Sequence, residues 1–487
     1  AAILLAGSNM AAAEDTGTLY TEHCADCHGA NRLGGTGPAL LPGNLGRLKP
    51  DQAIEVVTHG RPATQMPAFG ETLDRQAIEA LVAFVFAKPD MVPEWREADI
   101  EESRAALADT SAVTAPQFDS DPLNLFVVVE TGDHHATILD GDSFAALDRF
   151  QTRFALHGGP KFTPDGRYVF FMSRDGWVTK YDLWALEVVA EVRAGINSRN
   201  IAISKNGKHL AVANYLPQTL VVLSTTDLSL EKLFEVKSRR GETSRVSAVY
   251  QAPPRDSFIA ALKDVPEIWE IATDPDAPPV YEGLVHSYEK GMVEGIASSS
   301  GLVARKRSSV PVPMDDFFFS PDYEHVIGSA RGGNEAIVVD LTIRRDIARI
   351  GLPGLPHLGS GITWLHEGRR VMATPHLREG LVSVIDMQDW KLVTSIKTKG
   401  PGFFMRSHEA TRYAWTDVFF GPNRDLLHVI DKDSLKIVKT LRPAPGKTAA
   451  HVEFDRDGSH AIVSIWENDG AIVIYDAATL EEVRRIP

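Results

Sequence analysis

The stretch 162–171, which reads FTPDGRYVFF, contains the clearest signal of the fold in this sequence. A Pro-Asp-Gly turn is followed at once by β-branched and aromatic residues, a pattern typical of a tight turn that leads into a buried β-strand. Related stretches recur at 203–212 (ISKNGKHLAV), 319–327 (FSPDYEHVI) and 454–463 (FDRDGSHAIV). This recurrence predicts one structural unit that is used several times along the chain.

The far ends of the strands recur as well. Apolar runs close on an aspartate at Tyr181-Asp182, Val339-Asp340, Ile385-Asp386, Ile430-Asp431 and Tyr475-Asp476. A repeat of roughly 40–45 residues with about four strands indicates the blades of a β-propeller. The units begin near residues 125, 161, 203, 249, 319, 362, 406 and 454, so about eight blades fill residues 123–487, with an insertion in the unit 249–318. A two-sheet sandwich is less favoured, because it would not need such even spacing.

The N-terminal part has a different character. Cys24-Ala25-Asp26-Cys27-His28 is a C-x-x-C-H sequence, the attachment signature of c-type heme, and it uses the only two cysteines of the chain. Cys24 and Cys27 would form thioethers with one heme, and His28 would ligate its iron. The alternative is a redox C-x-x-C, which requires a thioredoxin-like βαβ setting and would leave His28 without a role.

Met66, which precedes Pro67 in a non-helical stretch, is the candidate for the second axial ligand of this heme. Its surroundings, M-P-x-F-G, resemble the methionine loop of class I cytochromes c. A thioether ligand raises the iron potential, which suits an electron acceptor or relay. His59 is the competing ligand.

The rest of this region reads as a small all-α domain. A helix is expected between Asp74, its N-cap, and Pro89, because apolar residues recur with helical spacing at Ile78, Leu81, Val82, Val85 and Phe86. We therefore assign residues 14–90 to a cytochrome c domain and residues 91–122 to a linker with one short helical stretch at about 97–107. Residues 1–13 resemble the end of a signal peptide, which predicts export to the periplasm.

Three histidines of the repeats, His157, His357 and His451, lie just ahead of a turn on strands expected to enter the propeller channel, and each is flanked by small residues. A lone histidine of this kind is more often a core residue, but three of them favour a flat, heme-type ligand. His376 and His408 lie near comparable points. Arg174, Arg199 and Arg245 stand at strand starts and suit carboxylates, although surface charge is the simpler interpretation of each one.

Charge and hydropathy exclude two classes of function. With 65 acidic and 50 basic residues the net charge is −15, which disfavours nucleic-acid binding. No apolar run approaches the roughly 20 residues needed to span a bilayer.

A cytochrome c domain followed by an eight-bladed propeller resembles the cytochrome cd1 family, whose propeller holds heme d1. In the propeller the resemblance rests on 154–157 (FALH), 166–169 (GRYV), 173–175 (SRD), 182–184 (DLW), 213–215 (ANY), Arg245-Val246, Pro356-His357, 373–376 (ATPH) and 464–466 (SIW). It implies that His157 is the proximal ligand of the d1 iron. It also implies that the carboxylates of heme d1 are bound by Arg174, Arg199, Tyr215 and Arg245.

The sequence departs from the nitrite reductase of this family, which uses two distal histidines. His357 matches one of them, but Met314 stands at the other and cannot transfer a proton. The residues 317–319 (FFF) replace a glycine-rich stretch, His451 stands where the reductase has an amide, and we do not expect the long N-terminal arm that carries a tyrosine ligand. These departures favour a member of the family that acts in heme d1 biosynthesis.

The resemblance therefore implies a periplasmic oxidoreductase that oxidises a propionate of dihydro-heme d1 to the acrylate and passes the electrons to its heme c. His357 or His451 would be the catalytic base, and either could instead ligate the d1 iron. The alternatives are a nitrite reductase producing nitric oxide and a heme d1 carrier without chemistry. The expected partners are the heme d1 precursor, other heme d1 maturation proteins, the cytochrome cd1 nitrite reductase as product acceptor and a periplasmic electron acceptor.

Overall fold

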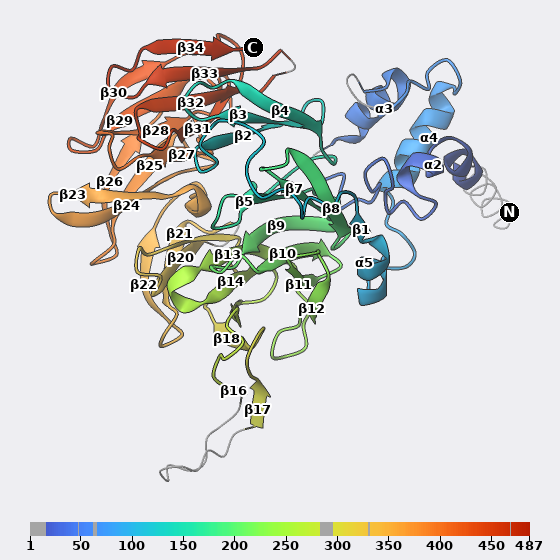
Figure 1. The fold of residues 1–487 in the computed structure, drawn as a ribbon, viewed down its shortest axis with the longest axis horizontal. Coiled ribbons are helices and arrows are strands. Elements are labelled where there is room, and N and C mark those ends of the chain that lie inside the picture. Colours follow the sequence, from blue (N-terminus) through green and yellow to red (C-terminus); the bar gives the residue numbers. More distant parts are fainter. Residues whose placement is uncertain (1–15, 47, 62–65, 283–295, 330–331, 468) are drawn as a thin grey trace, which may run out of the picture. The chain divides into compact units, whose positions relative to one another are not determined.

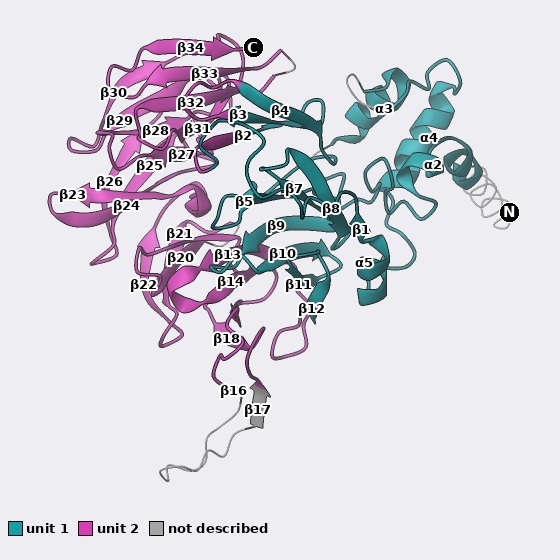
Figure 2. Ribbon diagram, in the orientation of Figure 1, with its two compact units in different colours: residues 1–122, 127–139, 146–236 teal, residues 123–126, 140–145, 237–487 magenta. Residues whose placement is uncertain are grey.

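The structure is a computed structural model that describes residues 16–46, 48–61, 66–282, 296–329, 332–467 and 469–487. The expected signal peptide remnant, 1–13, lies outside the described residues. The chain divides into two compact units (Figure 2): unit 1 comprises residues 1–122, 127–139 and 146–236, and unit 2 comprises residues 123–126, 140–145 and 237–487. No helix of the described ranges is long and apolar enough to cross a membrane.

The N-terminal part of unit 1 is helical, as expected. Residues 16–23 are helical and are followed by α2 (Ala25–His28), α3 (Pro50–His59) and α4 (Arg75–Phe86). The predicted N-cap of α4 is confirmed, because the Asp74 carboxylate accepts a hydrogen bond of 2.8 Å from the N–H of Ala77. One face of α4, with Ile78 and Leu81, packs against Tyr20 in a small apolar core.

The expected linker is partly a component of a blade. It contains α5 (Glu97–Ser103) and β1 (Ala105–Ala106), and β1 pairs antiparallel with β8 (Glu187–Arg193), where Ala105 lies opposite Glu191. Two backbone strands that share a ladder can join over any sequence distance, and the short alanine pair carried no strand signal that would have predicted this contact.

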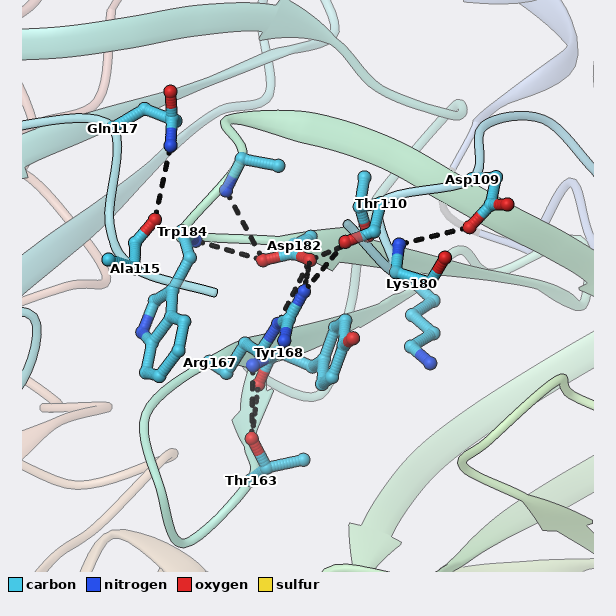
Figure 3. Close-up of polar contacts among 12 residues, drawn as sticks. Asp109, Thr110, Ala115, Gln117, Thr163, Arg167, Tyr168, Lys180, Asp182 and Trp184 are labelled. Carbon is cyan, nitrogen blue, oxygen red and sulfur yellow. Dashed lines mark hydrogen bonds and ion pairs between the residues drawn. The ribbon is translucent and has the colours of Figure 1, made fainter. Parts of the chain in front are cut away.

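Polar contacts attach the next part of this segment to the same blade (Figure 3). Thr110 donates its hydroxyl to Asp182 at 2.7 Å, and the Arg167 guanidinium donates both to the backbone oxygen of Thr110 at 3.0 Å and to Asp182 at 2.9 Å. The Asp182 carboxylate is fully buried, so these partners satisfy a charge that water does not reach.

Unit 1 contributes two complete antiparallel sheets and most of a third (Figure 1). The three-stranded sheet, which the unit boundary divides, consists of β2 (Leu125–Glu130), β3 (His135–Asp140) and β4 (Ala146–Gln151). The next is built from β5 (Lys161–Phe162), β6 (Tyr168–Met172), β7 (Trp177–Asp182), β8 and β1. The third consists of β9 (Asn197–Ile203), β10 (His209–Leu216), β11 (Thr219–Ser224) and β12 (Leu230–Glu235).

The described residues of unit 2 form five four-stranded sheets. The first consists of β13 (Val246–Ala252), β14 (Ser257–Leu262), β15 (Glu267–Ala272) and β18 (Arg305–Ser309), with the short helix η1 (Pro253–Arg255). The second consists of β19 (Asp316–Phe319), β20 (His325–Ser329), β21 (Glu335–Asp340) and β22 (Arg345–Gly351). The third, preceded by η2 (Leu358–Ser360), consists of β23 (Ile362–His366), β24 (Arg369–Pro375), β25 (Leu381–Asp386) and β26 (Lys391–Lys397). The fourth consists of β27 (Met405–Ser407), β28 (Tyr413–Asp417), β29 (Leu427–Asp431) and β30 (Lys436–Leu441). The fifth consists of β31 (Ala449–Phe454), β32 (His460–Ile465), β33 (Ala471–Asp476) and β34 (Glu482–Ile486).

These sheets are the blades of an eight-bladed β-propeller, and the predicted fold class is confirmed. The predicted insertion is also confirmed, since β16 (Val280–Glu282) and β17 (Ile296–Ser299) form a separate pair between β15 and β18. The predicted starts at 125, 161 and 362 coincide with first strands, whereas the third blade begins at Asn197 rather than 203. The reason is that the recurring motif spans the end of the first strand and the following turn, so it marks the first hairpin of a blade.

The recurring aspartates have a structural explanation. Each ends the third strand of a blade and caps the turn that follows; Asp386, for example, accepts hydrogen bonds from the N–H groups of Gln388 at 2.8 Å and Asp389 at 2.9 Å. An arginine at or just before the start of the preceding strand pairs with several of them, as Arg369 does with Asp386. The hydrogen bond from Arg369 is the main reason why the pKa of Asp386 lies below its usual value.

Candidate functional sites

His28, the predicted ligand of heme c, lies buried at the end of α2. Its Nδ1 is 2.8 Å from the carbonyl oxygen of Pro38, which can only accept, so Nδ1 carries the proton and the lone pair is on Nε2. A side chain on Gly37 would lie 2.7 Å from Cε1 of this imidazole, so glycine is needed for the ring to fit. Burial lowers the pKa of His28 and keeps the ring neutral, as a metal ligand must be.

The two cysteines fit thioether attachment better than thiol redox chemistry. Burial, with a contribution from Cys27, raises the pKa of Cys24 to about 11. Reactive C-x-x-C pairs work in the opposite direction, since they require a lowered thiol pKa. Cys24 also borders the apolar core formed around Tyr20 and Leu81, a suitable surface for one edge of a porphyrin.

Met66 remains the candidate for the second axial ligand. It is half-buried in a loop held to α3 by a hydrogen bond of 2.9 Å from Phe69 N–H to Val57 O, and its own carbonyl accepts a hydrogen bond from Arg61. The competitor, His59, has a side chain that is 72% exposed and lies 3.4 Å from Glu55. Its surroundings are those of a surface ion pair on a helix. Residues 62–65 of the loop lie outside the described residues.

Three predicted residues of the propeller meet in unit 1. His157 Nδ1 is 2.7 Å from the carbonyl oxygen of Arg199, so its lone pair is on Nε2, where it accepts a hydrogen bond of 2.9 Å from the Arg199 guanidinium. The backbone of Arg174 joins the same place, because its N–H donates to Ala155 and its carbonyl accepts from Ser198, both at 3.0 Å. An imidazole lone pair beside the Arg199 guanidinium suits an iron tetrapyrrole with carboxylate side chains.

Tyr215 belongs to the same part of unit 1. It lies half-buried on β10, which pairs with the β9 strand that carries Arg199.

The N-terminal domain contacts this part of the propeller within unit 1. The Arg193 guanidinium donates to the carbonyl oxygen of Leu33, and Asn44 donates to the carbonyl oxygen of Ile196 at 2.9 Å. Trp95 donates its indole N–H to the carbonyl oxygen of Arg193 at 2.8 Å. The domain with the C-x-x-C-H sequence is thus held against the strand that precedes Arg199.

Arg245 has a partner that the sequence did not predict. In unit 2 its guanidinium makes a bidentate pair with Asp264, with Nε to Oδ2 at 2.9 Å and Nη2 to Oδ1 at 2.6 Å. The backbone N–H of Arg245 donates to the same carboxylate. A carboxylate of a ligand would therefore compete with Asp264 for this arginine.

His357 is held in unit 2 by three groups. Its Nδ1 is 2.5 Å from the carbonyl oxygen of Phe403 and 2.8 Å from Ser360 Oγ, and its ring stacks on the Phe403 ring at 4.4 Å. Because the carbonyl can only accept, Nδ1 carries the proton and Nε2 can accept one. Asp316, which the sequence analysis missed, lies 3.8 Å from Nε2.

His451 stands at an irregularity of β31. Its φ is +62°, in the left-handed region that non-glycine residues rarely adopt, and the register of β31 with β32 shifts between Ala450 and Glu453. The bulge turns the imidazole toward Phe404, whose ring lies edge-on at 4.5 Å. The side chain is 39% exposed, and burial of the ring lowers its pKa, which Glu453 opposes.

The contacts of His376, His408 and Met314 indicate a structural role for each of them. His376 is fully buried and uses both ring nitrogens, toward the Pro353 carbonyl and, at 2.9 Å, Ser383 Oγ. His408 accepts a hydrogen bond from the N–H of Ala410 in a turn. Met314 is fully buried in an apolar cluster with Phe317, so its thioether contributes packing.

Two protein families match different parts of this chain. Residues 120–279 and 303–487 match the family of the Cytochrome D1 heme domain, and residues 11–85 match the family of Cytochrome C oxidase, cbb3-type, subunit III. The chain therefore belongs to the family of proteins with a cytochrome D1 heme domain, and it carries a cytochrome c domain at its N-terminal side.

Two relatives frame the comparison. A dihydro-heme d1 dehydrogenase of Pseudomonas aeruginosa is 52% identical over 99% of this chain and 94% of its own. A nitrite reductase of Stutzerimonas stutzeri is 26% identical over 96% of this chain and 89% of its own. Among solved structures, the dihydro-heme d1 dehydrogenase NirN in complex with DHE matches with a TM-score of 0.89 at 52% identity, covering 96% of each chain.

Proposed function

We propose that this protein is a periplasmic c-type cytochrome that oxidises a propionate side chain of dihydro-heme d1 to the acrylate. The observation that carries the proposal is the 52% identity with a dihydro-heme d1 dehydrogenase over nearly the whole of both chains. The distant relation to a nitrite reductase, at 26% identity, and the buried Met314 support it further, because a thioether in the core cannot deliver a proton to nitrite.

Oxidation of the propionate requires residues that bind the substrate, a base and an electron acceptor. Converting a –CH2–CH2– segment to –CH=CH– releases two electrons and two protons. His157, through Nε2, would bind the iron of the substrate, while Arg174, Arg199 and Tyr215 hold its carboxylates. Arg245 would join them by exchanging Asp264 for a substrate carboxylate.

Proton removal falls to His357 or His451. A neutral imidazole is a suitable base near neutral pH, and His357 exposes an unprotonated Nε2 because its Nδ1–H is taken by the Phe403 carbonyl. Whichever of the two is not the base would be the candidate for a second ligand of the iron. A heme held by Cys24, Cys27, His28 and Met66 would supply the one-electron acceptor. A periplasmic acceptor would reoxidise it between the two electrons.

The product would pass to other heme d1 maturation proteins and to the cytochrome cd1 nitrite reductase. A carrier that binds heme d1 without chemistry is the alternative from another class, and it predicts binding without a change of the macrocycle.

Steady-state turnover with variants tests this proposal. The protein with its heme c attached is incubated with dihydro-heme d1 and an artificial electron acceptor, and the product is identified by mass. We expect formation of the acrylate, and a fall of at least about 100-fold when His357 and His451 are both replaced by alanine, as is usual for the loss of a general base. His408→Ala, in a turn, is the matched control. Unchanged oxidation in the double variant would show that neither histidine removes the proton.

The pH profile separates the two histidines. Burial lowers the pKa of His451, so this imidazole stays neutral and able to accept a proton at more acidic pH than an ordinary histidine. If His451 is the base, the acid limb of kcat/KM lies below about 6.5, the usual histidine pKa, and His451→Ala abolishes that limb. A limb that His451→Ala leaves in place assigns the proton transfer to another group.

A further inference from the structure

Asp417 is a buried carboxylate in unit 2 that the proposed mechanism does not use. It ends β28, its residue surface is 1% exposed, and no Lys, Arg or His side chain of the described residues forms an ion pair with it. Burial of a lone carboxylate is costly, and here it raises the pKa of Asp417 to about 7. Such a group persists in a core only where other donors stabilise it.

The donors are backbone N–H groups of neighbouring segments. Phe403 N–H donates to Oδ1 at 2.6 Å and Phe404 N–H to Oδ2 at 3.1 Å. The backbones of Phe419 and His451, like those of the first two, oppose the effect of burial on the pKa of this carboxylate. Asp417 therefore ties the loop before β27 to its own strand, β28, which is in contact with β31.

Each of the first two peptides leads directly to a candidate catalytic histidine. Phe403, whose N–H is held by Asp417, accepts the Nδ1–H of His357 on its carbonyl at 2.5 Å and stacks its ring on the imidazole. Phe404 packs its ring edge against His451. The aromatic side chains between the two histidines, Phe403 and Phe404, are themselves in contact at 4.4 Å.

The backbone of His451 is strained. Its φ of +62° is costly for a residue with a Cβ and persists only where surrounding contacts hold it. The Phe404 ring against the imidazole is such a contact, and Asp417 holds Phe404 through its N–H.

We propose that Asp417 is a positioning residue that fixes both His357 and His451 for the reaction, through the peptide group between Phe403 and Phe404 and through the Phe404 ring. The inference rests on the proposed function for the meaning of the two histidines, but its geometry does not. Asp417 touches no reacting atom; it determines where the two imidazoles stand.

Hydrogen–deuterium exchange tests the geometry without substrate. Asp417→Ala removes the acceptors of the Phe403 and Phe404 N–H groups, and Asp417→Asn keeps the shape and one acceptor oxygen. Asp431→Asn is the matched control, because Asp431 is a carboxylate of the same blade, also 1% exposed, that pairs with Arg412 and caps the turn at Ser434. In the protein with heme c attached, we expect the amides of 403–404 and 451 to exchange at least about 10-fold faster in Asp417→Ala, less so in Asp417→Asn, and unchanged in the control.

Kinetics with dihydro-heme d1 supply the second readout. Displaced reacting groups lower the rate of the chemical step more than substrate binding, so we expect kcat to fall about 10- to 100-fold with KM within about threefold. If Asp417→Ala does not fold, Asp417→Asn decides. Unchanged amide exchange at both segments, or a kcat equal to that of Asp431→Asn, would overturn the inference. Failure of the proposed function would appear instead as an absence of product in the unmodified protein.

Discussion

At the scale of single residues, the histidines differ by what their second ring nitrogen meets. His28, His157 and His357 each give Nδ1–H to a backbone carbonyl and keep a lone pair on Nε2, whereas His376 uses both nitrogens inside the core. The sequence could nominate all of them, His28 by the C-x-x-C-H sequence and the others by their places in the repeats. It could not sort them, since two of the partner carbonyls lie 42 and 46 residues away along the chain.

The reduction potential of heme c can identify its second axial ligand. We expect Met66→Ala to lower the reduction potential of heme c, within the roughly 0.8 V range that axial ligands span, because a thioether favours the reduced iron. His59→Ala serves as the control, since its side chain is exposed beside Glu55. Redox titration of the heme c absorption measures both variants. A potential that falls for His59→Ala and not for Met66→Ala would reverse the assignment.

At the scale of elements, the sequence predicted the repeats more accurately than their contacts. Turns and apolar runs are local signals, so the insertion before β18 and the N-cap of α4 were predicted. The attachment of β1 to β8 was not predicted, because strand pairing joins segments about 85 residues apart and depends on an edge that the sequence does not display. Asp316 and Asp417 were missed for a related reason: the aspartates that recur in the sequence end third strands, whereas Asp316 begins a first strand and Asp417 ends a second.

The contact between the expected linker and its blade should contribute to the stability of the protein. Asp182→Asn breaks the buried pair with Arg167 and weakens the bond to Thr110, which should lower the free energy of unfolding by about 3 kcal/mol or more. Asp476→Asn, at the equivalent turn, disturbs mainly hydrogen bonds from Ala478 and Thr479 and should cost about 1 kcal/mol. Urea unfolding of the two variants measures the difference. Equal losses in the free energy of unfolding would mean that the contact with the linker does not stabilise the protein beyond the turn itself.

At the scale of the whole molecule, one unit contains the C-x-x-C-H domain together with His157, Arg174 and Arg199. The contacts Arg193–Leu33 and Asn44–Ile196 fix that domain beside β9. An electron donor bound at His157 and an electron acceptor bound at His28 would thereby belong to one compact body, as internal electron transfer requires. The sequence predicted the order of the two domains, but the contacts between them come from side chains with no recognisable pattern.

In the proposed reaction, oxidation of the bound macrocycle delivers electrons to heme c. The most direct measurement mixes the oxidised protein anaerobically with dihydro-heme d1 and follows, in the same samples, the absorption of heme c and the mass of the macrocycle. We expect heme c to become reduced in step with the loss of two hydrogen atoms from the macrocycle. A macrocycle that stays bound with unchanged mass, or a product that forms while heme c remains oxidised, would contradict it.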